Sequence, residues 1–162
     1  MTTTPSIHRS TERAVASETL HANLQRVLVA LVDLHLQGKQ AHWNVTGRGF
    51  RDLHLQLDEL VDAAREHSDT IAERLRALQV VPDGRAETVA TKTDLSPYPD
   101  GLVTVGDTVD AIVERTAQTV EVVRTVHDDV DAEDPTSADL LHEIIHDLEK
   151  QAWMISSENT EA

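Results

Sequence analysis

Histidines and carboxylates recur along residues 50–78 at a spacing that a helix would align. His54 and Asp58 are four residues apart, and so are Asp69 and Glu73. At about 100° per residue all four fall in a stripe roughly 100° wide, so each pair can converge on one metal ion. Asp58 and Asp69, however, are separated by about 16 Å along the helix axis. One ion therefore cannot be reached by both pairs of a single helix.

A second copy of this helix would remove the separation. If it lay antiparallel across a two-fold axis, Asp69 and Glu73 of the mate would face His54 and Asp58, twice per dimer. His42, at the end of the preceding helix, supplies a fifth group, because the turn between the two helices folds that end beside His54. Two imidazoles and three carboxylates suit Fe(II), Mn(II) or Zn(II). The spacing predicts a metal site shared between two chains. The simpler alternative is that these residues merely solvate an amphipathic helix.

The same residues resemble a known family. The runs AHWNVTG, FRDLHLQLDE and DTIAER, at residues 41–47, 50–59 and 69–74, look like the ferroxidase signature of the Dps family, the ferritin-like DNA-binding proteins from starved cells. All five metal-ligand positions match in type and spacing. The runs DPTSADLL and LEKQAWMI resemble the family's last helix, so the similarity covers about residues 17–157.

The resemblance implies an all-α, ferritin-like four-helix bundle that assembles through two-fold and three-fold contacts into a hollow homododecamer. Such a shell oxidises Fe(II) to Fe(III), preferably with hydrogen peroxide and otherwise with oxygen, stores the ferric mineral and protects DNA from oxidative damage. By the same resemblance Asp139 matches the carboxylate that lines a three-fold iron pore, with Asp134 as its neighbour. Glu143, four residues after Asp139, could extend an acidic channel. Alternatively, these acids only favour the N-terminal turns of a helix through its dipole.

Composition fits one soluble domain built from helices. The chain has 162 residues and no cysteine, which excludes disulfides and thiolate metal sites. No apolar run approaches the length of a membrane span and no signal peptide opens the chain, so we expect a cytoplasmic protein, with association with the nucleoid left open. The net charge of −15 argues against general nucleic-acid affinity and agrees better with the attraction of cations. Aromatic residues are too few to build the core, which must consist of Leu, Val, Ile and Ala; they are Trp43, Phe50, Tyr98 and Trp153.

Periodicity divides the chain into a tail, residues 1–16, and a bundle, residues 17–158. The first two long helices are predicted at about 17–44 and 50–78. The polar, proline-containing crossover at 80–101 is long for a compact domain, so we expect a short helix near 86–91 within it. The third helix begins near Gly106, with Thr104 and Asp107 as a capping pair. An acidic turn is expected at 128–134, after which Asp134-Pro135 opens the last helix.

Three smaller sets of residues are also assigned roles. His35 lies one heptad before His42 and is expected behind the metal ligands or in the packing. Trp43 is expected at the dimer contact near the metal, or as core filling. The tail carries the cations His8, Arg9 and Arg13 beside Glu12. Because DNA binding in the Dps family often depends on a basic tail, these cations leave DNA as a possible partner.

Three other functions remain open. His142-Glu143-Ile144-Ile145-His146 satisfies H-E-x-x-H, a zinc-protease signature, although a protease would need a third ligand and a substrate cleft. The Glu-x-x-His motifs at 18–21 and 143–146 would fit a bacterioferritin-like di-iron site within one subunit. A non-catalytic structural protein of the nucleoid is the third alternative.

Overall fold

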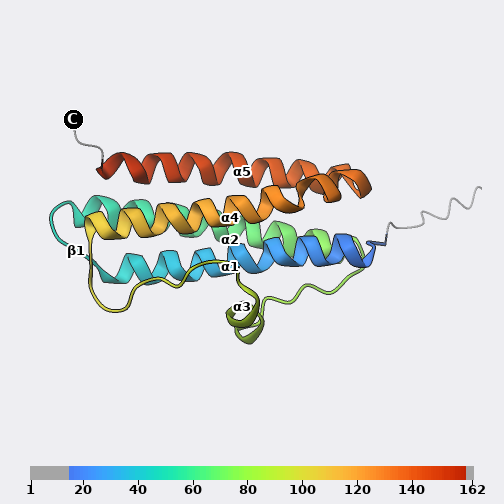
Figure 1. The fold of residues 1–162 in the computed structure, drawn as a ribbon, viewed down its shortest axis with the longest axis horizontal. Coiled ribbons are helices and arrows are strands. Elements are labelled where there is room, and N and C mark those ends of the chain that lie inside the picture. Colours follow the sequence, from blue (N-terminus) through green and yellow to red (C-terminus); the bar gives the residue numbers. More distant parts are fainter. Residues whose placement is uncertain (1–14, 160–162) are drawn as a thin grey trace, which may run out of the picture.

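Four long helices run side by side in the computed structural model, which describes residues 15–159 (Figure 1). Helix α1 packs against α2 and α4, and α5 packs against α4 and α2. The predicted all-α four-helix bundle is therefore confirmed. None of the described helices is long and apolar enough to cross a membrane. The helices are α1 (Glu18–Asn44), α2 (Phe50–Ala77), α4 (Val105–Glu133) and α5 (Pro135–Ser156), and the 3-10 turn η1 (Ser157–Asn159) follows α5.

The crossover between α2 and α4 carries structure of its own, as predicted. Helix α3 (Ala86–Lys92) lies outside the bundle against α1 (Figure 1). Two short strands, β1 (Val45–Thr46) and β2 (Val103–Thr104), pair in parallel and join the end of α1 to the start of α4. This strand pair was not predicted, because two residues are too few to show a period.

The helix starts follow from local capping. The Ser17 hydroxyl accepts the amide hydrogen of Leu20, and the Thr104 hydroxyl accepts that of Asp107 and donates to its carboxylate. The predicted capping pair Thr104 and Asp107 is confirmed. Each such cap satisfies backbone donors that the first helical turn would otherwise leave without partners.

The acidic turn predicted at 128–134 is wrong. Helix α4 continues through Glu133, and only Asp134 separates it from α5. The helix persists because Val130 is buried in the core, while the acidic residues of this segment stay exposed to water. Glu133 is also used: its carboxylate accepts hydrogen bonds from the Ser17 amide at 2.9 Å and the Ser17 hydroxyl at 2.6 Å.

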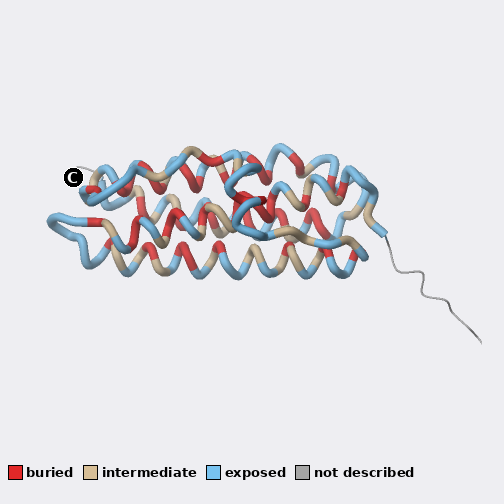
Figure 2. The backbone as a smooth tube through the Cα atoms, turned by 90° about the horizontal axis from the view of Figure 1, so that it is seen from below, coloured by how far each residue is buried: buried red, intermediate tan, exposed pale blue. Residues whose placement is uncertain are grey.

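Aliphatic side chains fill the space between the helices, as the shortage of aromatic residues predicted. Figure 2 shows buried positions recurring along each long helix, on the sides that face the bundle. Burying each large aliphatic side chain contributes about 1.5–3 kcal/mol of hydrophobic stabilisation. The largest completely buried side chains include Leu24, Leu31, Leu57, Leu60, Ile71, Ile112, Leu141 and Leu148.

Glycines shape the connection that carries the first metal-ligand candidates. A Cβ on Gly38 would lie 3.0 Å from Cγ2 of Val61, so this glycine permits the close approach of α1 and α2 one turn before His42. In the following turn Gly47 and Gly49 adopt φ angles of 112° and 80°, a backbone conformation that residues with a side chain rarely adopt. The turn therefore reverses the chain within a few residues and starts α2 beside the end of α1.

Candidate metal centre

His42 and His54 face each other across this turn. The two imidazoles are stacked, with ring centroids 3.6 Å apart and planes inclined by 20°. His42 Nδ1 donates to the backbone carbonyl of His54, and His54 Nδ1 donates to that of His42, both at 2.8 Å. A carbonyl oxygen can only accept, so Nδ1 carries the hydrogen in both rings. Nε2 of each ring is consequently the nitrogen that can offer a lone pair to a metal ion.

This arrangement is the one that metal-binding histidines use. A histidine ligand commonly donates its second ring N–H to a backbone carbonyl, which fixes the ring and its tautomer. Here each of the two residues does this for the other. The His42 side chain is only 9% exposed, which limits the space in which the ring can reorient. The pair is therefore held ready for coordination through Nε2.

Asp58, one turn after His54, is close to both histidines but is engaged by a lysine. Lys39 Nζ lies 2.5 Å from Asp58 Oδ1, and His42 Nδ1 lies 3.2 Å from the same oxygen. The hydrogen bond from Lys39 lowers the pKa of Asp58, and the nearby imidazoles add to this effect. Asp58 is thus a carboxylate at neutral pH, and a metal ion would compete with Lys39 for it. Sequence reasoning missed Lys39, although it lies three residues before His42 on the same helix.

Asp69 and Glu73 lie farther along α2, where both are exposed. The described part of the chain contains no group of three or more histidine, cysteine, aspartate or glutamate residues placed to hold a metal ion. One chain thus brings His42, His54 and Asp58 near one another and leaves Asp69 and Glu73 apart from them. This is the separation that the helical spacing predicted.

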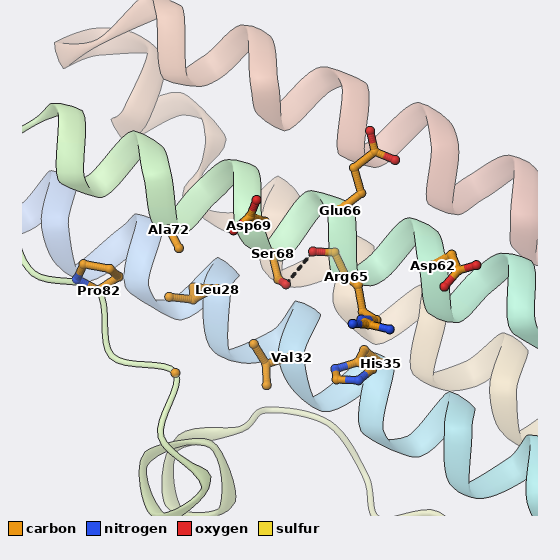
Figure 3. A pocket seen from close by; sticks show the side chains of 11 residues that line it. Leu28, Val32, His35, Asp62, Arg65, Glu66, Ser68, Asp69, Ala72 and Pro82 are labelled. Atoms are coloured by element: carbon orange, nitrogen blue, oxygen red, sulfur yellow. Dashed lines mark hydrogen bonds between the residues drawn. The ribbon is translucent and has the colours of Figure 1, made fainter.

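Asp69 lines a groove of about 620 Å³ between α1, α2 and the crossover (Figure 3). The floor of the groove is apolar, with Leu28 and Val32 from α1 and Ala72 from α2. Charged residues of α2 border it, and His35 lies beneath Arg65 in Figure 3. Burial and the positive charge of Arg65 lower the pKa of His35, so its imidazole is neutral at pH 7.

Comparisons with known proteins identify the family of the chain. Residues 21–161 match the ferritin-like domain family. The chain is 36% identical over 143 residues to the DNA protection during starvation protein of Agrobacterium fabrum, and the match covers 88% of each protein. It is also 36% identical over 135 residues to DNA protection during starvation protein 2 of Deinococcus radiodurans, covering 82% of this chain and 55% of that longer protein. The chain belongs to the Dps family.

Solved Dps structures have the same fold. The Dps of Microbacterium arborescens in its high iron form superposes with a TM-score of 0.84 at 33% identity, covering 91% of this chain and 99% of that one. DpsA14 from Streptomyces coelicolor gives a TM-score of 0.84 at 31% identity, covering 88% of this chain and 85% of that one. The ferritin-like bundle that the resemblance implied is confirmed.

The three residues expected at a Dps pore differ in their surroundings. Asp139 and Glu143 are exposed on α5, one turn apart. Asp134 is the N-cap residue of α5, as predicted, and its carboxylate binds Arg74 Nη2 at 2.6 Å and the hydroxyl of Ser137. Burial would raise the pKa of Asp134, but these hydrogen bonds outweigh it and lower the pKa. Asp134 is therefore paired within its own chain, whereas Asp139 and Glu143 are exposed, and the place of all three residues at a pore stays a prediction.

The other candidates are resolved unevenly. Trp43 is 67% exposed, so core filling is wrong for it, and its expected place at a dimer contact stays a prediction. His67, for which the sequence analysis gave no role, has a side chain that is 16% exposed, and its Nε2 lies 3.0 Å from Asp147 Oδ2. The tail cations His8, Arg9 and Arg13 lie outside the described residues.

Proposed function

We propose that this Dps-family protein is a ferroxidase that oxidises Fe(II) at a site shared by two subunits and stores the ferric product. His42, His54 and Asp58 of one chain would bind iron together with the partner's Asp69 and Glu73. The reciprocal hydrogen bonds between His42 and His54 carry this proposal, because they leave Nε2 of both rings available for a metal. Nitrogen and oxygen ligands without sulfur suit iron in both oxidation states.

The stacking of the two rings favours two iron positions over one. A metal bound to an imidazole lies in the plane of the ring, about 2 Å from the nitrogen. The rings are stacked, with centroids 3.6 Å apart and planes inclined by only 20°, so the planes meet far beyond the length of a metal–nitrogen bond and one ion cannot lie in both. Each histidine would therefore hold its own iron, and the carboxylates of the shared site would supply the remaining ligands.

Two neighbouring Fe(II) ions match the chemistry of hydrogen peroxide. Together they would supply the two electrons that, with two protons, reduce hydrogen peroxide to two water molecules and leave two Fe(III), so that no hydroxyl radical is released. Carboxylates stabilise the Fe(III) that forms, because Fe(III) is the harder cation. Oxygen is the alternative oxidant. The high iron form of the Microbacterium arborescens Dps supports iron as the cargo of this chain as well.

The site would operate in a cytoplasmic, hollow homododecamer built through two-fold and three-fold contacts. Asp139 and Glu143 are proposed to line the entrance for Fe(II) at the three-fold contact, and the net charge of −15 attracts cations to the shell. The relatives that are named for DNA protection during starvation support a protective role for this chain. DNA itself would be contacted through the N-terminal tail.

The single-subunit alternatives find no support in the described residues. A bacterioferritin-like site needs its ligands inside the bundle, but Glu18, Glu143 and His146 are exposed. The H-E-x-x-H motif has no third ligand beside it, because no group of three potential ligands is assembled in this part of the chain. These exposed and scattered residues favour a site completed by a second subunit over a site within one chain.

Complementation tests the sharing directly. A dimer of one His54→Gln chain and one Glu73→Gln chain contains one doubly altered site and one intact site. Unfolding, mixing and reassembling equal amounts of the two inactive variants should restore about one quarter of the wild-type fast Fe(II) oxidation. Variants with His146→Gln and Glu121→Gln, treated alike, control for the procedure. Full inactivity of the mixture would show that the site lies within one chain.

A further inference from the structure

Helix α2 carries two charges, Asp62 and Arg65, between the two halves of the proposed iron site. Both side chains are exposed and both border the groove that contains Asp69 (Figure 3). At about 100° per residue they fall within the same stripe as His54 and Glu73. They therefore belong to the face of α2 that the partner subunit would cover.

Neither charge is neutralised within residues 15–159. No ion pair joins Asp62 or Arg65 to any described residue. Arg65 extends over α1 toward His35, which is neutral and offers it no negative charge (Figure 3). Covering either charge with an uncharged surface would cost free energy, so this face favours a partner that supplies the opposite charges.

The proposed ligand pairs determine where the two-fold axis passes. His54 faces the partner's Glu73, and Asp58 faces the partner's Asp69. Both pairs have the same midpoint, between Ala63 and Ala64, as an antiparallel arrangement about a two-fold axis requires. Positions equally distant from this midpoint face each other. Asp62 and Arg65 are equally distant from it and have opposite charges.

We propose that Asp62 of each subunit pairs with the partner's Arg65, so that two ion pairs flank the two-fold axis and set the register of the dimer. The inference rests on the shared iron site proposed above. Register is decisive for that site, because a slip of one helical turn moves the ligands by about 5.4 Å, whereas metal–ligand bonds are about 2 Å long. Asp62 and Arg65 thus act as positioning residues that touch no iron.

Charge reversal tests this pairing in the full-length chain. Asp62→Arg alone or Arg65→Asp alone places four like charges around the axis, and the double variant restores opposite charges with their places exchanged. The measured quantity is the protein concentration at which half of the two-fold contacts have dissociated. We expect each single variant to raise this concentration at least about ten-fold, and the double variant to return it to near the wild-type value. Sedimentation velocity and native mass spectrometry measure this equilibrium.

Controls separate the pairing from general effects of charge. Glu121→Arg makes the same change as Asp62→Arg on the exposed side of α4 and should leave dissociation unchanged. Helix content by circular dichroism should also be unchanged in all variants, because both side chains are exposed in the single chain. Single variants that assemble like the wild type, or a double variant that dissociates as readily as the single ones, would overturn the pairing.

The outcome can be distinguished from a failure of the proposed function. If the His54→Gln and Glu73→Gln variants complement each other while the double charge reversal stays dissociated, the ion pairs are wrong and the shared site stands. If these two variants do not complement each other, the shared site falls and the register derived from it falls too.

Discussion

His42 and His54 each donate Nδ1–H to the backbone carbonyl of the other at 2.8 Å. The two residues are twelve positions apart and lie on different helices, so the turn between α1 and α2 holds both rings in their tautomers at once. Loss of one ring would remove its stacking contact with the other, although the remaining ring would keep its hydrogen bond to a backbone carbonyl. Because the proposed oxidation needs an iron at each ring, we expect the two histidines to behave as one unit in mutational experiments.

The first prediction follows from this coupling. His42→Gln and His54→Gln should each reduce the rate of the fast phase of Fe(II) oxidation at least about 100-fold. Losing a residue that only orients a metal ligand already lowers metal affinity or activity by about 10–100-fold, and losing the ligand itself should cost more. The double variant should be little worse than either single one. Stopped-flow absorbance with hydrogen peroxide and with oxygen measures the rates, and His146→Gln is the control. Additive losses in the double variant would show two independent residues.

The second prediction concerns Lys39. Lys39→Met should remove the hydrogen bond to Asp58, return the pKa of that carboxylate toward its ordinary value of 3.8 and free it for metal. Metal binding should tighten by roughly two- to ten-fold, which is the range for loss of a partly exposed ion pair. Calorimetry with Zn(II), which cannot be oxidised, measures the affinity. Lys92→Met on α3 is the matched control, and unchanged affinity would mean that Lys39 does not compete.

The third prediction concerns entry of iron. Asp139→Asn should slow mineral growth while leaving the rate of the first oxidation events nearly intact, because only the attraction of cations toward the entrance is lost. Asp139→Glu keeps the charge and should grow mineral at close to the wild-type rate. Iron uptake is followed by absorbance of the ferric core over successive additions. Uptake by the Asn variant at the wild-type rate would remove Asp139 from the entrance.

The fourth prediction is a pH dependence at the start of α5. The pKa of Asp134 lies below its ordinary value of 3.8, so its contribution to stability is complete above about pH 4 and disappears as pH falls through the lowered pKa. Asp134→Asn should cost about 1–2 kcal/mol at pH 7, and the cost should shrink toward zero in acid. Thermal unfolding between pH 7 and pH 2.5 tests this, with Asp131→Asn as the control. An equal loss at every pH would exclude the ionised carboxylate as the cause.

Much of the fold could be predicted because it depends on local patterns. The spacing of apolar residues located the four long helices, and Thr104 with Asp107 marked the start of α4. Charge was a poorer guide, since the acidic run at 128–134 is compatible with a turn or with an exposed helical face. Val130 decides between them by being buried, and burial depends on the packed bundle.

The part of the candidate site that depends on spacing along one helix could also be predicted. Spacing along one helix showed that Asp69 and Glu73 cannot join His54 within one chain. The ion pair between Lys39 and Asp58 could not be predicted, because it joins two helices and depends on their relative rotation. The pairing of His67 with Asp147 was missed for the same reason.

The bond between Ser17 and Glu133 has a consequence for anything attached to the beginning of the chain. It fastens the first turn of α1 to the last residue of α4, directly beside Asp134 and the start of α5. Residue 15, the first that the structure describes, therefore lies at the end of the bundle where α4 meets α5, and Asp139 lies within the first two turns of α5. If the tail binds DNA and Asp139 lines the iron entrance, as proposed above, DNA would be held close to the point at which Fe(II) is removed from solution.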